Sequence, residues 1–245
     1  MDQKEFCEKY RIYHYDIDEQ GRINTSYSVS LSDLGLEELP VKFGIVNGSF
    51  NISNNNLTNL KGLPEIVDGV LSVNSNKLTS LEGCPKKVKY DMYLHENELT
   101  DLEHFPKRAN GSVYLRDNKL TSLKGCARKV NGDFILYNNK NLTSLKYGPQ
   151  SVTGDYNAIS CGIRTLESIP NNLKSDWLPL YENPVFEIIG SNKYDDLMTF
   201  KSCKVIRNDK IVLNRLKLYL NIIGALSKPK LDLILSDVKD LYEIV

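Results

Sequence analysis

Apolar and polar residues follow a pattern that recurs about every 21 residues along most of the 245-residue chain. The same point of successive copies holds Leu36, Leu57, Leu78, Leu99, Leu120, Leu142 and Ile163. A fixed period of about 20 to 29 residues with this internal pattern is typical of a leucine-rich-repeat solenoid, in which each copy forms one coil. The pattern predicts an α/β solenoid with a parallel sheet on its concave side.

Within each copy, two apolar residues separated by one position predict a short strand with one face toward the core. These pairs are Phe50 and Ile52, Leu71 and Val73, Met92 and Leu94, Val113 and Leu115, and Phe134 and Leu136. Pro and Gly punctuate the rest of each copy, as at Pro64, Gly69 and Pro85. Because these residues favour turns and extended backbone, no long helix is expected on the convex side.

A regularly spaced Asn follows each strand and is the most specific signal in the sequence. The positions are Asn55, Asn76, Asn97, Asn118 and Asn139, with Cys161 at the equivalent place in the next copy. A buried amide is tolerated only when it is hydrogen bonded. We therefore expect each Asn to bridge backbone groups that are left unpaired where the chain leaves the strand.

The two ends of the chain lack the full repeat and are predicted to cap the solenoid. Residues 1–35 contain a short helical segment, from Asp2 to about Tyr10, and a hairpin around the turn 18–21. Residues 36–185 form the repeats, with Leu178, Leu180, Asn183 and Val185 as a degenerate last strand. Residues 186–245 show helical spacing and are expected to pack over the last coil as a small helical cap.

Composition narrows the class of protein. The chain has 31 basic and 31 acidic residues, which argues against a wholly electrostatic nucleic-acid binder. Its five cysteines contain no C-x-x-C pair, and Cys84 and Cys126 share an apolar repeat position, so we expect buried thiols and no metal site. No apolar run is long enough to span a bilayer and the first residues are charged, which predicts a cytoplasmic protein.

Outward-facing residues of the sheet are not needed for folding, so they are candidates for function. The richest set lies in the central copies and comprises Tyr93, His95, Tyr114, Arg116, Ile135 and Tyr137. Tyr and Arg commonly anchor protein interfaces, so this set predicts a partner-binding site. The alternative is that the tyrosines only stabilise neighbouring strands through cross-strand contacts.

A second candidate surface lies in the C-terminal segment, where residues 201–230 hold eight Lys or Arg and only one acid, Asp209. If this segment binds nucleic acid, the contacting residues are expected to be Lys201, Lys204, Arg207, Lys210, Arg215 and Lys217. Catalysis is not predicted, because His14, His95 and His104 show neither a metal-ligand spacing nor a nucleophile motif. No cofactor is expected.

The segments LTNLKGLPEIVDG, LTSLEGCPKKV and LTSLKGCARKVNGDF, with the opening stretch SVSLSDLGLEELPVKFGIVNGSF, resemble leucine-rich-repeat proteins of large tailed bacteriophages. The resemblance covers residues 12 to about 215. It implies the fold and a phage origin, while most such proteins have no assigned activity. Bacterial effectors with short leucine-rich repeats hold host proteins on the concave face, but this chain has no catalytic Cys domain like that of the ligases among them.

Together these observations predict a non-enzymatic protein-binding module. Its expected role is to bind, and to inhibit or redirect, a host protein such as a defence factor in the host cytoplasm. On its own the chain is expected to be a monomer with no membrane association. The alternatives are nucleic-acid binding through the basic C-terminal helices and a structural role in the virion.

Overall fold

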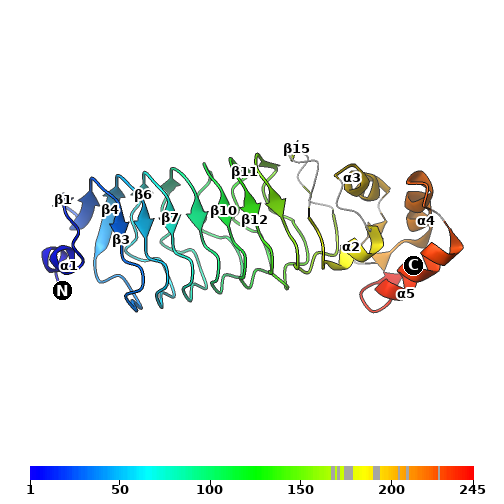
Figure 1. Cartoon of the computed structure of the whole chain (residues 1–245), viewed down its shortest axis with the longest axis horizontal. Coiled ribbons are helices and arrows are strands. Elements are labelled where there is room, and N and C mark those ends of the chain that lie inside the picture. Colours follow the sequence, from blue (N-terminus) through cyan, green and yellow to red (C-terminus); the bar gives the residue numbers. More distant parts are fainter. Residues whose placement is uncertain are drawn as a thin grey trace.

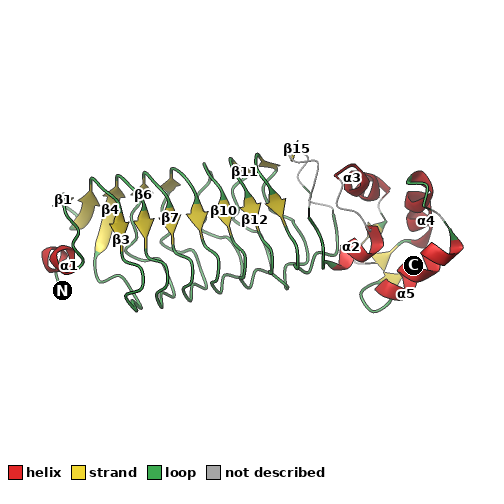
Figure 2. Ribbon diagram, viewed as in Figure 1, coloured by secondary structure: helices red, strands yellow, loops and turns green. Residues whose placement is uncertain are grey.

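The computed structural model describes residues 1–166, 169, 172–173, 179–189, 194–203, 205–207, 210–225 and 227–245. Its coils stack side by side along one axis, with the N-terminus at one end and the last helices at the other (Figure 1). Loops and turns make up most of each coil, and the helices lie at the two ends (Figure 2). The predicted solenoid with an N-terminal hairpin cap and a small helical C-terminal cap is confirmed.

A parallel sheet of seven strands runs through the coils. In spatial order its strands are β14 (Tyr156–Asn157), β12 (Phe134–Ile135), β10 (Val113–Tyr114), β9 (Met92–Tyr93), β7 (Leu71–Ser72), β5 (Phe50–Asn51) and β3 (Val29–Ser30). The first residue of each strand is buried, because successive side chains of a strand alternate between the core and the outer face. Equivalent residues of neighbouring copies therefore lie directly opposite one another.

A second, interrupted sheet lies on the return path. One part comprises β1 (Tyr15–Ile17), β2 (Arg22–Thr25), β4 (Lys42–Val46), β6 (Ile66–Val67) and β8 (Lys87–Val88), and the other β11 (Lys129–Val130), β13 (Ser151–Val152) and β15 (Asn172–Leu173). At the interruption, the side chain of Asn110 donates to the carbonyl of Val88 at 2.9 Å. The sequence predicted an extended return path without long helices, but it did not predict that these segments pair.

The core is a continuous column of the repeated apolar positions. Leu57, Leu78, Leu99 and Leu120 are each at most 1% exposed. Leu36, at the same position of the first copy, is only half-buried. Terminal copies have one neighbour fewer to cover them, so a more exposed first position is expected.

The Asn side chains form the predicted ladder. In Asn118, Oδ1 accepts the N–H of Leu99 at 3.0 Å, while Nδ2 donates to the carbonyls of Leu94 and Leu115, both at 3.1 Å. Leu99 and Leu94 belong to the preceding coil, so each amide links two coils. Asn183 makes the same contacts at the last coil, where it accepts from Ile163 and donates to Ala158.

Cys161 interrupts this ladder. Its Sγ contacts the Leu136 carbonyl at 3.5 Å and does not accept a hydrogen bond from Leu142. In this longer copy, which contains the extra residue Asn141, the N–H of Leu142 donates to the carbonyl of Asn139 at 2.9 Å instead. In the lengthened copy, the carbonyl of Asn139 thus replaces the thiol as the acceptor for the N–H of Leu142.

The residue before each ladder position has a left-handed backbone. These residues are Asn54, Ser75, Glu96, Asp117, Asn138, Ser160 and Glu182, with φ between 52° and 62°. They are polar in every copy, and none is a Gly. This conformation turns the chain off the strand and places the residue at the rim of the outer face.

The N-terminal cap begins with α1 (Gln3–Lys9), whose capping box pairs Asp2 with Glu5. Phe6 and Cys7 of this helix are fully buried against the first coil. The hairpin of β1 and β2 follows, and β2 pairs in parallel with β4. The cap therefore extends the return-path sheet by two strands.

The C-terminal cap contains α2 (Pro184–Ile189), α3 (Tyr194–Cys203), α4 (Leu213–Ile222) and α5 (Lys228–Val238). A small sheet of β16 (Ile206–Arg207), β17 (Lys210–Ile211) and β18 (Glu243–Ile244) joins them and was not predicted. Of the predicted last strand, Leu178 lies outside the described residues. Residues 179–183 form no strand, although the carbonyl of Tyr181 still accepts the N–H of Ser160 at 2.9 Å.

Candidate protein-binding face

The strand register places the central residues of the predicted site in one row. Tyr114 of β10 lies opposite Tyr93 of β9 on one side and opposite Ile135 of β12 on the other. Their buried neighbours Met92, Val113 and Phe134 anchor the strands in the core. The name tyrosine face is used below for this outer surface, made of Tyr93, His95, Tyr114, Arg116, Ile135 and Tyr137, all of which are half-buried.

Two tyrosines of this face form a parallel stack. The ring centroids of Tyr93 and Tyr114 are 4.8 Å apart, with an angle of 4° between the planes. This spacing is set by the distance between neighbouring strands. His95 meets Tyr93 edge to face, at 6.0 Å and 82°. The rings are thus held in place before any partner arrives, which lowers the entropic cost of binding.

Arg116 is held by acids of the same face. Its Nη2 lies 2.7 Å from Oε1 of Glu96, and its Nη1 pairs with Asp117. Its guanidinium also lies 5.9 Å from the ring centroid of Tyr137. Glu96 accepts a further hydrogen bond from Ser75 Oγ at 2.8 Å, and these contacts lower its pKa. The guanidinium of Arg116 is therefore held in one orientation, and the carboxylates of Glu96 and Asp117 balance its charge.

Glu96 and Asp117 were missed by the sequence analysis. They are the left-handed residues that precede Asn97 and Asn118, so they fall outside the alternating strand pattern. Their fixed place, one residue before each ladder Asn, is the signal that could have located them at the rim of the face. A carboxylate at this place can pair with a side chain of the same coil or of the neighbouring coil, as Asp117 and Glu96 do with Arg116.

The surroundings of His95 favour the neutral form of its imidazole. Its Nδ1 is buried and has no hydrogen-bond partner among the described residues. Burial lowers the pKa of the imidazole below its usual value near 6.5, and the nearby cation of Arg116 lowers it further. Glu96 and Asp117 oppose this effect but are smaller causes. Near pH 7 the face therefore presents a neutral imidazole.

This lowered pKa makes stability depend on pH. The unfolded chain binds a proton at His95 more readily than the folded chain, so acidification stabilises the unfolded state. We expect the free energy of unfolding to fall between about pH 7.5 and about pH 5.5, and to fall less in His95→Gln. Urea titrations of both proteins at the two pH values test this. Equal losses in the two proteins would contradict the assigned role of His95.

Three polar residues that precede the strands β9, β10 and β12 have a structural role. Asp91 Oδ1 accepts the N–H of Ser112 at 2.7 Å, and Ser112 Oγ accepts the N–H of Asp133 at 3.0 Å. Asp133 Oδ1 in turn accepts the N–H of Asp155 at 2.9 Å. These side chains link successive coils ahead of the strands. Asp91 is therefore engaged with the next coil and is not among the charges that shift the pKa of His95.

Two of the predicted basic C-terminal residues are engaged with other groups of the described chain. Lys210 pairs with Glu243 at 2.8 Å, and Lys201 Nζ donates to the carbonyl of Ile169 at 3.4 Å. Arg215 and Lys217 of α4 are exposed. Lys204 lies outside the described residues, and Arg207 is described by its backbone in β16.

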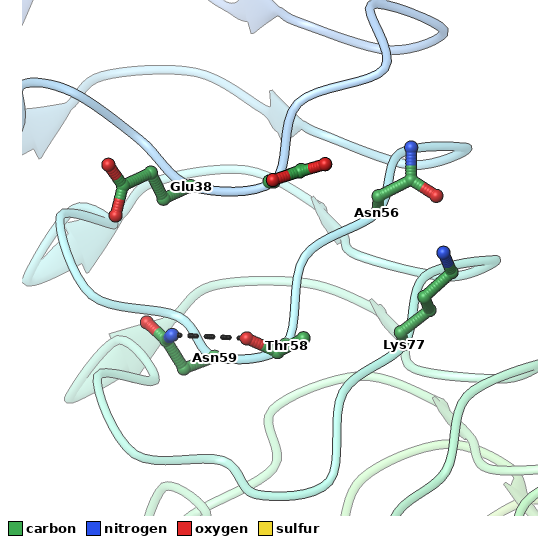
Figure 3. A pocket seen from close by; sticks show the side chains of 6 residues that line it. Glu38, Asn56, Thr58, Asn59 and Lys77 are labelled. Atoms are coloured by element: carbon green, nitrogen blue, oxygen red, sulfur yellow. Dashed lines mark hydrogen bonds between the residues drawn. The ribbon is translucent and has the colours of Figure 1, made fainter.

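One shallow surface pocket of about 560 Å³ brings no reactive groups together. It is lined by Glu37, Glu38, Asn56, Thr58, Asn59 and Lys77. These residues come from adjacent coils, and the carboxylate of Glu38 points away from the amine of Lys77 (Figure 3). Among the residues that line this pocket, Figure 3 draws one hydrogen bond, from Asn59 Nδ2 to Thr58 Oγ1 at 3.4 Å.

The cysteines are all free thiols. Cys84 and Cys126 are half-buried rather than fully buried as predicted, yet they pack against the core. Burial raises the pKa of both thiols to about 12. Within the described residues, no cluster of three or more His, Cys, Asp or Glu has the arrangement of a metal site. None of the described helices is long and apolar enough to cross a bilayer.

The tyrosine face is therefore the best-organised group of interface-type side chains that we find in the described structure. It combines a fixed aromatic stack, a compensated Arg and a neutral His on adjacent strands. No protein-family model, curated protein or solved structure matches the chain, so its function has to be inferred from its own residues.

Proposed function

We propose that the protein is a non-enzymatic binding module whose tyrosine face holds another protein. The observation that carries this proposal is the Tyr93–Tyr114 stack, whose rings are aligned within 4° on neighbouring strands. Rigid aromatic side chains bring large contact area at little entropic cost, which is why they dominate interface energies. Arg116, oriented by Glu96, adds a directional donor beside them.

The partner that best suits this face is a folded protein surface with apolar and polar groups side by side. A strongly anionic partner such as nucleic acid is less suited, because Glu96 and Asp117 already neutralise Arg116. The resemblance to phage repeat proteins supports a host protein as partner. Binding would then inhibit or redirect that host protein, for example a defence factor, in the cytoplasm of the infected cell.

The cross-strand contact itself also stabilises the sheet, by about 0.2–1 kcal/mol for such a pair. This contribution does not depend on a partner, so stability and binding have to be measured separately. A variant of the face that folds normally but loses its partner would distinguish binding from a purely structural role of the tyrosines.

The test is affinity purification of the tagged protein from bacterial lysate at physiological salt with nuclease added. We expect a host protein to be recovered with the wild type and lost with the Tyr93→Ala, Tyr114→Ala, Tyr137→Ala triple variant. The control is Tyr90→Ala with Tyr147→Ala, because these tyrosines are 52% and 57% exposed outside the face. Thermal unfolding followed by circular dichroism checks that each variant is folded.

Recovery of the same partner by the triple variant would contradict the proposal. Recovery of only nuclease-sensitive material, with retention that falls steeply as salt rises, would favour the basic C-terminal helices as the binding site. Light scattering of the pure protein tests the third role, a structural one in the virion. Self-assembly into a larger structure would give a mass above that of the monomer.

A further inference from the structure

The N-terminal cap completes only one of the two sheets. Strand β2 continues the return-path sheet beyond β4, and β1 follows β2. The seven-stranded sheet instead ends at β3, which pairs with β5 on one side and has none of the described strands on the other. The helix α1 and the hairpin lie at this end of the molecule (Figure 1). One sheet edge therefore stays open beside the cap.

The backbone of β3 offers hydrogen-bonding groups at this edge. Val29 N–H donates to the carbonyl of Ser49 at 2.9 Å, and Leu31 N–H donates to that of Asn51 at 2.7 Å. Because alternate residues of a strand point their N–H and C=O to opposite sides, those of Ser30 point away from β5. Ser30 is exposed, and these two groups form no backbone hydrogen bond with residues 1–166. Such an edge is a template for another strand.

A pocket of about 420 Å³ lies along this edge, within the range of ligand sites. It is lined by Tyr10, Arg11, Ile12, Tyr13, His14, Tyr27, Ser28, Val29 and Ser30. The N–H of Ser26 donates to the carbonyl of His14 at 3.2 Å, which prolongs the pairing of β1 with β2 and does not involve β3. The cap thus forms one wall of a groove and does not pair with the strand that forms the other.

The walls of the groove are aromatic and basic. Tyr13 and Tyr27 are 66% and 61% exposed, and His14 meets Tyr27 edge to face at 5.2 Å. Arg11 is exposed and has no ion pair among the described residues. No carboxylate lines the pocket. A segment that binds there would complement it with apolar side chains toward the tyrosines and an acidic side chain toward Arg11.

We propose that this groove binds an extended, acidic segment of a partner protein, which adds to β3 as one further strand. The open N–H and C=O of Ser30 would hold the segment's backbone, while Tyr13, Tyr27 and Arg11 would select its side chains. The groove lies at the end of the sheet, where two strands, β5 and β7, separate β3 from the tyrosine face at β9. It is therefore independent of the function proposed for that face.

The test uses short random peptides on an array, probed with the purified full chain. We expect retained peptides to carry an acidic residue within a strand-forming stretch, and the variant Ser30→Pro to bind them about tenfold more weakly. Proline is tolerated on an edge strand where the N–H is not used for pairing, so this variant should fold. Tyr147→Ala, which removes an exposed tyrosine elsewhere, serves as the control and should bind normally.

Methylation of the peptide backbone gives a second readout. If the peptide adds as a strand, N-methyl groups at alternate amides should abolish binding, and those at the intervening amides should be tolerated. The absence of retained peptides, or an equal effect of methylation at every amide, would overturn the proposal. So would a wild-type dimer that Ser30→Pro converts to monomer, because the occupant of the edge would then be a second copy of the chain.

Discussion

Asn118→Ala is expected to lower the free energy of unfolding by about 2–4 kcal/mol. The substitution removes the acceptor of the buried Leu99 N–H and the donor to the carbonyls of Leu94 and Leu115. Each group left without a partner in the interior costs about 1–3 kcal/mol. Urea unfolding at neutral pH measures the loss.

The matched control is Asn131→Ala, which removes an exposed amide and should change stability by no more than about 0.5 kcal/mol. Asn118→Cys is a sharper comparison. At Cys161 the thiol is accommodated because Leu142 donates to Asn139 in the lengthened copy. The copy of Asn118 lacks that insertion, so Cys there should restore little stability. A cysteine variant as stable as the wild type would contradict the account of the ladder.

Gly83→Ala is expected to destabilise the protein by about 3–5 kcal/mol. Gly83 has φ +89°, and a Cβ placed on it would lie 2.5 Å from the carbonyl oxygen of Leu60 and 2.6 Å from its carbonyl carbon. Both atoms are backbone of the preceding coil and cannot rotate away. The coils would have to separate where the N–H of Leu60 donates to the carbonyl of Glu82 at 3.1 Å.

Gly35→Ala isolates the conformational part of this cost. Gly35 also has a positive φ, +65°, but no atom lies within 4 Å of its added Cβ. We expect it to lose only about 1–2 kcal/mol, the usual cost of a left-handed backbone for a residue with a Cβ. Chemical denaturation of the two variants under the same conditions gives the difference. Equal losses would mean that the close approach of the coils has no energetic effect.

Much of the solenoid was predictable because the period fixes which side chains are buried. Leu99 and Asn118 could be placed from spacing alone, since every copy repeats the same inward positions. The pairing of the return-path segments was not predictable in this way. Val67 and Val88 stand among turn residues, and whether they pair depends on how closely successive coils stack.

The candidate site was predicted in part for the same reason. The register that stacks Tyr93 on Tyr114 follows from the repeat. The ion pairs that orient Arg116 depend on side chains of Glu96 and Asp117, whose left-handed backbone is not visible in a hydrophobic pattern. The hydrogen bond of Asp91 to the next coil joins residues 21 positions apart, so a pattern of neighbouring residues does not reveal it.

The interruption of the Asn ladder at Cys161 has a mechanical consequence. Hydrogen bonds between coils run along the stacking axis, so a force that pulls the two ends apart loads the coil interfaces in series. An interface with fewer bonds then yields before its better-bonded neighbours. At Cys161 a thiol contact of 3.5 Å replaces the amide bonds that Asn118 and Asn139 make to their preceding coils. Under tension, the coil interface at Cys161 should therefore yield before those bridged by Asn118 and Asn139, and the tyrosine face should stay intact.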